Sequence, residues 1–334
     1  MVRPPVSVSM AFVRGMLAAV QARGMDVLPL LTEAAIDPAL LDQASARVTG
    51  EQYVALFRLL IERCDDDGLG FFSRQLKRGS FALSVRVALG APTLLVAMRR
   101  VAHTWQLLQD DVRFVAVREG PLVGWVLHFS EGRTQQPNFM HEMLLRIYWR
   151  VLSWLVAARL PPVRFDLAFP CPAYAGSYRT VLPGELRFDQ AHSALWFDAA
   201  ALQWPIRRDE AALRSFLAQV QWNIILPRRR DDDVSTRARQ HLQTATPAWP
   251  DLAGTAQALQ MSVSTLQRHL AAEGTSFQAL KDELRRDLAI TRLTTSSVSL
   301  AALATDLGFS DSAAFQRAFK CWTGSPPGAY RRRG

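Results

Sequence analysis

The sequence predicts an α+β N-terminal domain, with antiparallel strands among helices, followed by an all-α domain with two helix-turn-helix units joined by a linker helix. Two observations carry this prediction. Between residues 111 and 197, hydrophobic residues change from helical spacing to strict alternation and back. Near the C-terminus, one helix-turn-helix pattern occurs twice. We assign residues 1–227 to the first domain and 228–334 to the second.

Composition indicates a globular and basic protein. The chain has 334 residues, of which 49% are hydrophobic and 21% are charged. Its net charge of +9 suits a polyanionic partner, such as nucleic acid or an anionic membrane. The alternative, which charge alone leaves open, is a basic soluble protein of no special affinity. The three cysteines are far apart and form no CxxC pair, which favours a reducing compartment and argues against a disulfide scaffold.

No segment has the pattern of an export signal or a membrane span. Arg14 interrupts the N-terminal apolar run, and the most apolar long segment, 144–160, contains three arginines. We therefore expect a cytoplasmic protein without a membrane partner.

The N-terminal domain begins with helices and then turns to strands. Helical spacing occurs at residues 9–23 and 92–107, with two or three short helices expected between them. Residues 111–130 alternate at every second position around Glu119, Gly120 and Pro121, which predicts a β-hairpin.

A long helix is predicted next, at residues 138–159, and Pro161 and Pro162 end it. Three strand-like runs separated by turn residues follow, at 162–170, 185–189 and 193–197. Residues 210–226 are helical again. Short strands among helices are typical of an α+β fold.

The boundary between the domains is predicted at Pro227. A run of three arginines and three aspartates follows it directly. From Val234 onward the chain has twelve basic and seven acidic side chains, so five of the nine net positive charges lie in this part. Concentrated positive charge is a feature of nucleic-acid-binding domains.

The pattern of a helix-turn-helix is most regular at residues 299–324. Ser299 and Asp311 are placed to cap two short helices. Gly308 between them can take the left-handed conformation that a tight turn requires. On the second helix Phe315 and Phe319 face inward and polar residues face outward, as in a helix that enters the major groove.

The same pattern occurs at residues 251–274, so the helix-turn-helix is repeated. Ala256 corresponds to Ala304 and Leu259 to Leu307, an offset of 48 residues. A linker helix is predicted between the copies, at 276–293. At 1.5 Å per residue it is roughly 25 Å long. This length could hold the two helix-turn-helix units about one DNA turn apart.

The last hundred residues resemble the DNA-binding domain of the AraC/XylS family of bacterial transcription regulators. The run LATDLGFSDSAAFQRAFK and the closing Gly324 to Arg331 carry this resemblance. The N-terminal domain resembles the arabinose-binding-type effector domain of regulators of ornithine utilisation and their relatives. The stretches GAPTLLVAMRRVAH and ALWFDAAALQWP carry that second likeness.

The resemblance implies which side chains contact double-stranded DNA. Base-reading positions fall on the second helix of each unit, and phosphate contacts on nearby basic groups. The predicted DNA-binding residues are Ser264, Gln267, Arg268, Ser312, Ala313, Gln316, Arg317, Lys320 and Arg292. Arginine pairs with guanine and glutamine with adenine in the major groove. The alternative to DNA contact is that Arg268 and Arg317 lie on a solvated helix face or form intramolecular salt bridges.

Two positions depart from the pattern. Gln260 stands where the second copy has Gly308, so the first turn is either shaped differently or strained by about 1 kcal/mol. Ala313 offers no hydrogen bond, so it can contribute only an apolar contact, for example with a thymine methyl group.

Motifs of other chemistry are missing. The pair His141-Glu142 lacks the second histidine of a zinc protease motif, and no nucleophile elbow, phosphate loop or dinucleotide fingerprint occurs. We therefore predict no enzyme, no cofactor and no metal site. Aromatic side chains can line a ligand cavity and hairpin cations can meet a carboxylate, so the effector-binding candidates are Trp105, Arg118, Trp125 and His128.

The sequence thus predicts a transcription regulator controlled by a small-molecule effector in its N-terminal domain. The alternative is a ligand-independent DNA-binding protein whose N-terminal domain only oligomerises. The prediction includes a homodimer and a contact to RNA polymerase among the partners to be tested.

Overall fold

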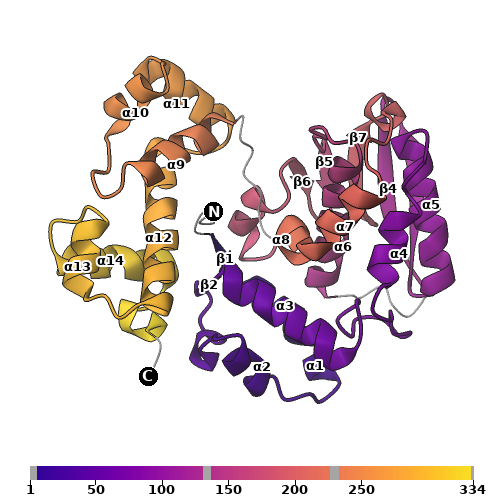
Figure 1. Ribbon diagram of the computed structural model, residues 1–334, viewed down its shortest axis with the longest axis horizontal. Helices are drawn as coiled ribbons and strands as arrows, with labels where there is room; N and C mark the ends of the chain where they lie inside the picture. Colours follow the sequence, from indigo (N-terminus) through magenta and orange to yellow (C-terminus); the bar gives the residue numbers. More distant parts are fainter. Residues whose placement is uncertain (1–5, 131–136, 226–232, 332–334) are drawn as a thin grey trace. The chain divides into compact units, whose positions relative to one another are not determined.

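The computed structural model describes residues 6–130, 137–225 and 233–331 (Figure 1). These residues form two compact units. The sheet unit contains residues 11–34 and 54–225, and the C-terminal unit contains 6–10, 35–53 and 233–331. The boundary predicted at Pro227, with the charged run up to residue 232, lies outside the described residues.

The sheet unit is rich in helices. They are α1 (Met10–Ala22), α2 (Leu28–Glu33), α3 (Gly50–Cys64, which begins in the C-terminal unit), α4 (Ser80–Arg86), α5 (Leu94–Leu108), α6 (Asn138–Leu155), α7 (Glu210–Ala218) and α8 (Val220–Ile225), with short 3-10 helices at Ala175–Thr180 and Ala201–Gln203. Thr93 caps α5 by accepting a hydrogen bond from the amide of Val96.

Five strands form one sheet in the order β3-β4-β7-β5-β6. Their bounds are β3 (Val112–Glu119), β4 (Leu122–Phe129), β5 (Arg164–Asp166), β6 (Glu185–Arg187) and β7 (Ser193–Asp198). The predicted hairpin is β3–β4, with Glu119 opposite Leu122. All neighbours are antiparallel except β5 and β6. The sequence-based prediction of an α+β domain with antiparallel strands is therefore confirmed.

The core of the sheet unit lies between the sheet and the helices. Helix α5 packs on β3, α6 on β7, and α4 against α5 (Figure 1). Aromatic rings meet edge to face in this layer, with Tyr148 of α6 5.0 Å from Phe114 and 5.3 Å from Trp125, between ring centroids. Such contacts add to the free energy gained by burying the rings.

The last predicted helix of this domain is in fact two helices. Gln219 leaves the helical region (φ −130°, ψ 31°) and separates α7 from α8. Two arginines of α6 reach the end of α8, where Arg146 donates to the carbonyl of Ile224 and Arg150 to that of Asn223. These bonds satisfy carbonyl groups at the end of α8 and hold this helix against α6.

The C-terminal unit is helical, as predicted. Its elements are α9 (Val234–Thr244), α10 (Leu252–Ala258), α11 (Val263–Ala272), α12 (Phe277–Thr295), α13 (Leu300–Asp306), α14 (Ser312–Thr323) and a 3-10 helix at Pro327–Tyr330. The two helix-turn-helix units are α10–α11 and α13–α14, and α12 joins them (Figure 1).

An N-terminal hairpin completes this unit. Strand β1 (Ser7–Ser9) pairs antiparallel with β2 (Arg47–Thr49), and β2 packs on α12. The hydroxyl of Ser7 donates to Asp287 of α12 over 2.5 Å, and the amide of Arg47 donates to the Tyr330 hydroxyl over 3.0 Å. Residues about 280 positions apart in sequence thus share one buried polar cluster.

Among the described residues, no helix is both long and apolar enough to cross a membrane.

Candidate nucleic-acid interface and ligand cavity

The second helix-turn-helix unit has the geometry that its sequence predicts. Ser299 accepts a hydrogen bond from the amide of Ala302, and Asp311 accepts one from that of Ala314, over 3.1 and 2.7 Å. Both residues therefore cap their helices. Phe315 and Phe319 are fully buried, so the opposite side of α14 remains open to solvent.

The turn of this unit requires glycine for two reasons. Gly308 has φ +71°, a conformation that other residues seldom adopt. A Cβ atom at this position would also lie 2.8 Å from Cδ1 of Trp249. The indole is fixed there because its Nε1 donates to the carbonyl of Asp306 over 2.7 Å.

The first helix-turn-helix unit makes the same turn without glycine. Gln260 has φ +57°, so the turn is left-handed there too. The sequence left open whether this turn is shaped differently or strained. Because Gln260 keeps the left-handed conformation, the turn is strained, at a cost of about 1 kcal/mol. Ser262 caps α11 by accepting from the amide of Thr265 over 3.1 Å.

Helix α12 ties both units together through two cations. The ammonium of Lys281 donates to the carbonyl of Trp249, just before α10. The guanidinium of Arg285 lies 5.0 Å from the Trp249 ring and 4.9 Å from the Phe309 ring, and it donates to the carbonyl of Gly308. The sequence-based prediction missed this arrangement, because these side chains carry no helical or repeat pattern of their own.

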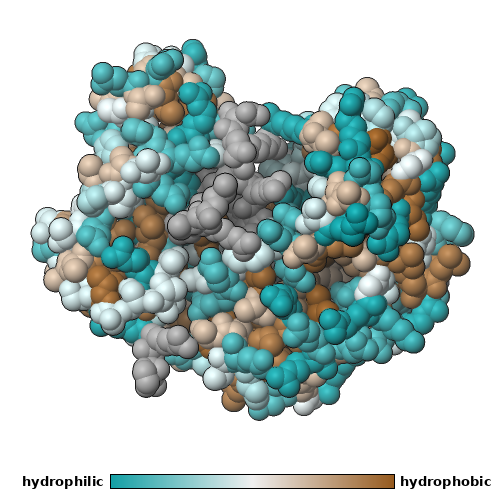
Figure 2. Space-filling view, in the orientation of Figure 1, coloured by the Kyte–Doolittle hydropathy of each residue, from teal (hydrophilic) through white to brown (hydrophobic). Residues whose placement is uncertain are grey.

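The predicted base-reading side chains lie on the outer faces of α11 and α14. Ser264, Gln267 and Arg268 are exposed on α11; on α14, Ala313, Gln316, Arg317 and Lys320 are exposed and Ser312 is half-buried. Figure 2 shows mostly hydrophilic side chains over α10 and α11, with single apolar ones between them.

These side chains differ in their present partners. Gln316 donates to the hydroxyl of Ser312 over 3.2 Å. Within the described residues, Arg268 and Arg317 form neither a hydrogen bond nor an ion pair. Arg292 of α12, by contrast, forms an ion pair with Asp306 over 2.8 Å. Two guanidinium groups on the outer faces are therefore available to a polyanion, and the third is held by a carboxylate.

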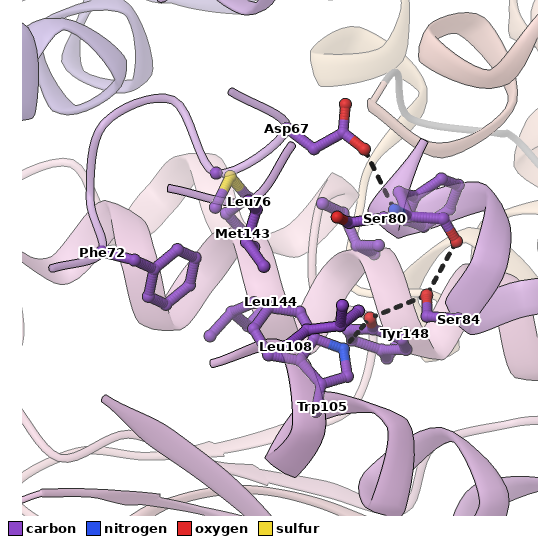
Figure 3. A pocket seen from close by; sticks show the side chains of 13 residues that line it. Asp67, Phe72, Leu76, Ser80, Ser84, Trp105, Leu108, Met143, Leu144 and Tyr148 are labelled. Carbon is purple, nitrogen blue, oxygen red and sulfur yellow. Dashed lines mark hydrogen bonds between the residues drawn. The ribbon is translucent and has the colours of Figure 1, made fainter. Parts of the chain in front are cut away.

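A second candidate site is a cavity in the sheet unit. It has an empty volume of about 430 Å³, part of which is open to solvent. The loop before α4, α4 itself, α5 and α6 supply its walls (Figure 3). Most lining side chains are apolar or aromatic, among them Phe72, Leu76, Phe81, Trp105, Leu108, Met143 and Leu144; the polar ones are Asp67, Ser80, Ser84 and Tyr148.

A short hydrogen-bond chain crosses the cavity wall (Figure 3). The indole Nε1 of Trp105 donates to the hydroxyl of Tyr148. Ser84 donates to the carbonyl of Phe81 over 2.8 Å, and its oxygen lies 3.4 Å from the Tyr148 hydroxyl. Burial raises the pKa of Tyr148, so this hydroxyl stays protonated. Its hydrogen has only the long contact to Ser84, and a ligand acceptor can take it instead.

Asp67 is the one charged residue in the described part of the cavity lining. One of its oxygens accepts from the amides of Gly79 and Phe81, over 3.0 Å each, and thereby holds the start of α4. Burial raises the pKa of this carboxyl group. Among the described residues that line the cavity, none has a basic side chain.

The structure distributes the four predicted effector residues over different places. Trp105 lines the cavity, and Trp125 lies behind it, in contact with Tyr148. Arg118 is exposed near the hairpin turn and donates to the carbonyl of Gly120. His128 lies on the opposite face of the sheet, and its ring centroid is 4.3 Å from that of His192. Asp67, Ser84 and Tyr148 were not predicted as effector residues, because only the fold brings them together.

Among the described residues, no group of three or more His, Cys, Asp or Glu side chains is placed to hold a metal ion.

Two family models match the chain. One is described as the arabinose-binding domain of AraC transcription regulator, N-terminal, and matches residues 24–206; the other is described as a helix-turn-helix domain and matches residues 255–333. The ornithine utilization regulator of Pseudomonas aeruginosa is 27% identical over 336 residues, which cover 97% of this chain and 96% of the relative.

An uncharacterized HTH-type transcriptional regulator of Mycobacterium tuberculosis is 28% identical over 93% of this chain and 92% of its own length. The crystal structure of the transcriptional regulator CdpR from Pseudomonas aeruginosa aligns with 98% of this chain and 99% of its own, at 18% identity and a TM-score of 0.34.

Proposed function

The chain belongs to the AraC family of transcription regulators, and from this premise we propose that it reads a promoter site with α11 and α14. As a member of this family it is a DNA-binding transcription regulator under the control of a small molecule. The proposal adds which side chains read the bases and where the small molecule binds.

Base reading is assigned to Arg268 and Gln267 on α11 and to Arg317 and Gln316 on α14. The supporting observation is that both guanidinium groups are exposed and form no ion pair within the described residues. An arginine in the major groove can donate two hydrogen bonds to guanine, and a glutamine can pair with adenine. Ser264, Ser312 and Ala313 would make the lesser contacts, and Lys320 and Arg292 would bind phosphates. Arg292 must then share or leave Asp306.

The test begins with selection of the preferred DNA site from random duplexes. Arg317→Ala should then lose about 1–3 kcal/mol of binding free energy and relax the choice at one base pair. Lys320→Ala is the matched control on the same helix. It should weaken binding to all sequences alike and reduce the salt dependence, because it removes a phosphate contact. Unchanged specificity of Arg317→Ala would overturn its base-reading role.

We place the effector in the cavity of the sheet unit. Its apolar walls and the Tyr148 hydroxyl fit a small apolar molecule with a hydrogen-bond acceptor, and no described residue of the lining is basic. A free amino acid such as ornithine would find no cationic partner for its carboxylate among the described lining residues. Arg118 and His128 are exposed or half-buried away from this cavity, so we assign the effector contacts to Trp105 with Ser84 and Tyr148.

A thermal-shift panel tests this assignment. A ligand that binds only the folded protein raises the melting temperature. Neutral aromatic compounds should raise it more than their carboxylate analogues, and Ile147→Trp, which fills the cavity, should abolish the difference. If no compound raises it, the ligand-independent alternative, in which the N-terminal domain only oligomerises, gains support.

The remaining partners are proposals of the same kind. We propose no catalytic activity, because the relatives are named as regulators. We also propose that the protein acts in the cytoplasm, forms a homodimer and contacts RNA polymerase at its promoter. In vitro transcription with purified polymerase tests the last point, by showing whether the bound regulator changes the yield of transcript.

A further inference from the structure

Strand β3 is an edge strand of the sheet. It lies at one end of the sheet and pairs with β4 through eight consecutive residue pairs, without a bulge. No other described strand pairs with its outer edge. Val115 and Val117 are 37% and 39% exposed, and all residues from 115 to 119 are solvent-accessible. Natural sheets usually protect long edges with charged side chains, proline or a bulge, since an open apolar edge pairs readily with another strand. The charged residues of β3 lie toward its ends, at Arg113, Arg118 and Glu119, and its centre is apolar.

The two faces of β3 differ. Val112 and Phe114 point toward the helices and are buried. The alternate residues Arg113, Val115, Val117 and Glu119 therefore project from the other face of the sheet. On that face Val126, Ala194 and Trp196 form a small apolar cluster beside Val115, which is directly opposite Val126.

We propose that β3 pairs with β3 of a second copy of this chain, antiparallel and around a two-fold axis at Ala116. The result is one continuous ten-stranded sheet. This inference rests on the proposed homodimer and specifies its surface; it does not depend on DNA binding.

The register follows from the faces and the charges. A two-fold axis perpendicular to the sheet keeps each face continuous, so residues of one face must meet residues of the same face. With the axis at Ala116, Val115 lies opposite the partner subunit's Val117, and Arg113 opposite the partner subunit's Glu119. Opposite charges and β-branched residues in directly facing positions stabilise antiparallel strands.

The neighbouring register is less favourable. An axis at Val115 would place Asp111 opposite the partner subunit's Glu119, so that two carboxylates would meet. It would also leave Arg113 opposite a valine. Within the described residues Arg113 has no ion-pair partner of its own. Glu119 already accepts from Arg164 over 2.9 Å, yet its side chain is 60% exposed, so it can be shared between two guanidinium groups.

Cysteine cross-linking tests this register directly. Facing residues of antiparallel strands have Cα atoms about 4.5–5.5 Å apart, which suits a disulfide bond. The exposed Cys171 and Cys321 are first replaced by serine. In that background of the full chain, Ala116→Cys should form a covalent dimer under mild oxidation. So should the double variant Val115→Cys/Val117→Cys, whereas each of its single variants should not.

Arg187→Cys is the matched control, an exposed position on β6 at the opposite edge of the sheet. A second measurement is the molar mass in solution by light scattering. Wild type should be a dimer and Val115→Lys a monomer with unchanged circular dichroism and unchanged binding to a single DNA half-site.

Two results would overturn the proposal. A monomeric wild type would refute self-association, and a dimer in which Ala116→Cys cross-links no faster than Arg187→Cys would place the interface elsewhere. Neither result bears on base reading by Arg317, so the two proposals fail independently.

Discussion

The two helix-turn-helix units share one backbone plan but fill it with different residues. Both have a capped second helix and a left-handed turn, at Gln260 in the first unit and at Gly308 in the second. The turn of the second unit is closed by Trp249, which leaves no room for a side chain. Gln260 is exposed, so its side chain extends into solvent. The comparison shows that the fold requires the conformation, whereas packing decides whether glycine is required.

The outer faces of the two units differ as well. Helix α11 offers Ser264, Gln267 and Arg268, while α14 places Ala313 at one of its four outer positions. Both helices therefore offer one serine, one glutamine and one arginine, and α14 adds an apolar position at Ala313. Site choice should depend on both units, because each carries one exposed arginine that forms no ion pair within the described residues.

Helix α12 joins both helix-turn-helix units. Removing a buried side chain of α12 should therefore destabilise both. Asp287 is nearly fully buried and accepts from Arg239 over 2.6 Å and from Ser7 over 2.5 Å. Asp287→Ala would leave buried cations without this carboxylate, so the free energy of unfolding should fall by about 3–5 kcal/mol. Urea unfolding of the full chain, followed by circular dichroism, measures the loss.

Asp282→Ala on the same helix is the control for this prediction. Its carboxylate is one-third exposed and lies 4.0 Å from Arg285, so its removal should change stability by about 0.5 kcal/mol or less. Equal losses for the two variants would show that the buried cluster contributes no more than a surface pair.

Gly308→Ala should show most clearly that the two turns differ in their need for glycine. An alanine with φ +71° costs about 1–2 kcal/mol, and its methyl group would press against the fixed Trp249 ring, for about 1–2 kcal/mol more. We expect a total loss of about 2–4 kcal/mol in urea unfolding. Gln260→Ala, the matched change in the other turn, keeps a non-glycine residue and should lie within about 0.5 kcal/mol of wild type.

Arg285→Met tests whether the cation holds the two units in register. Methionine keeps an apolar chain between Trp249 and Phe309 but removes the charge and the hydrogen bond to Gly308. A loss of about 1–2 kcal/mol of unfolding free energy is expected from the cation–π and hydrogen-bond contributions together. A variant as stable as wild type would mean that only the aliphatic part of Arg285 matters.

The helical spacing of the C-terminal unit was readable from sequence because its determinants are local. Ser299 and Asp311 act on amides three residues away, and a glycine turn or an apolar stripe is likewise visible within one helix length. The β-hairpin is local in the same sense. Its register, with Glu119 opposite Leu122, would even have placed Arg118 and His128 on opposite faces of the sheet, so these two could not share one ligand.

Contacts between distant segments were beyond the sequence. Ser7 and Asp287 are 280 residues apart, and no periodicity connects the N-terminal hairpin with α12. The cavity has the same property, since its polar wall joins Asp67, Ser84, Trp105 and Tyr148 from a loop and three helices. Trp105 could be chosen from the sequence as a large aromatic residue. Its neighbours can be identified as cavity residues only from the fold.

The smallest effect expected from the comparison is a gain in stability. Gln260→Gly removes a side chain from a left-handed position, which relieves about 1 kcal/mol of backbone strain. Glycine also gives the unfolded chain more conformational freedom, which offsets part of this gain. The net increase in unfolding free energy should be about 0.5 kcal/mol, measurable as a higher urea midpoint at constant slope. DNA affinity should stay unchanged, because Gln260 lies outside the reading helix α11. A lower midpoint would mean that the glutamine side chain stabilises the first turn through contacts of its own, and the two turns would then differ in more than glycine.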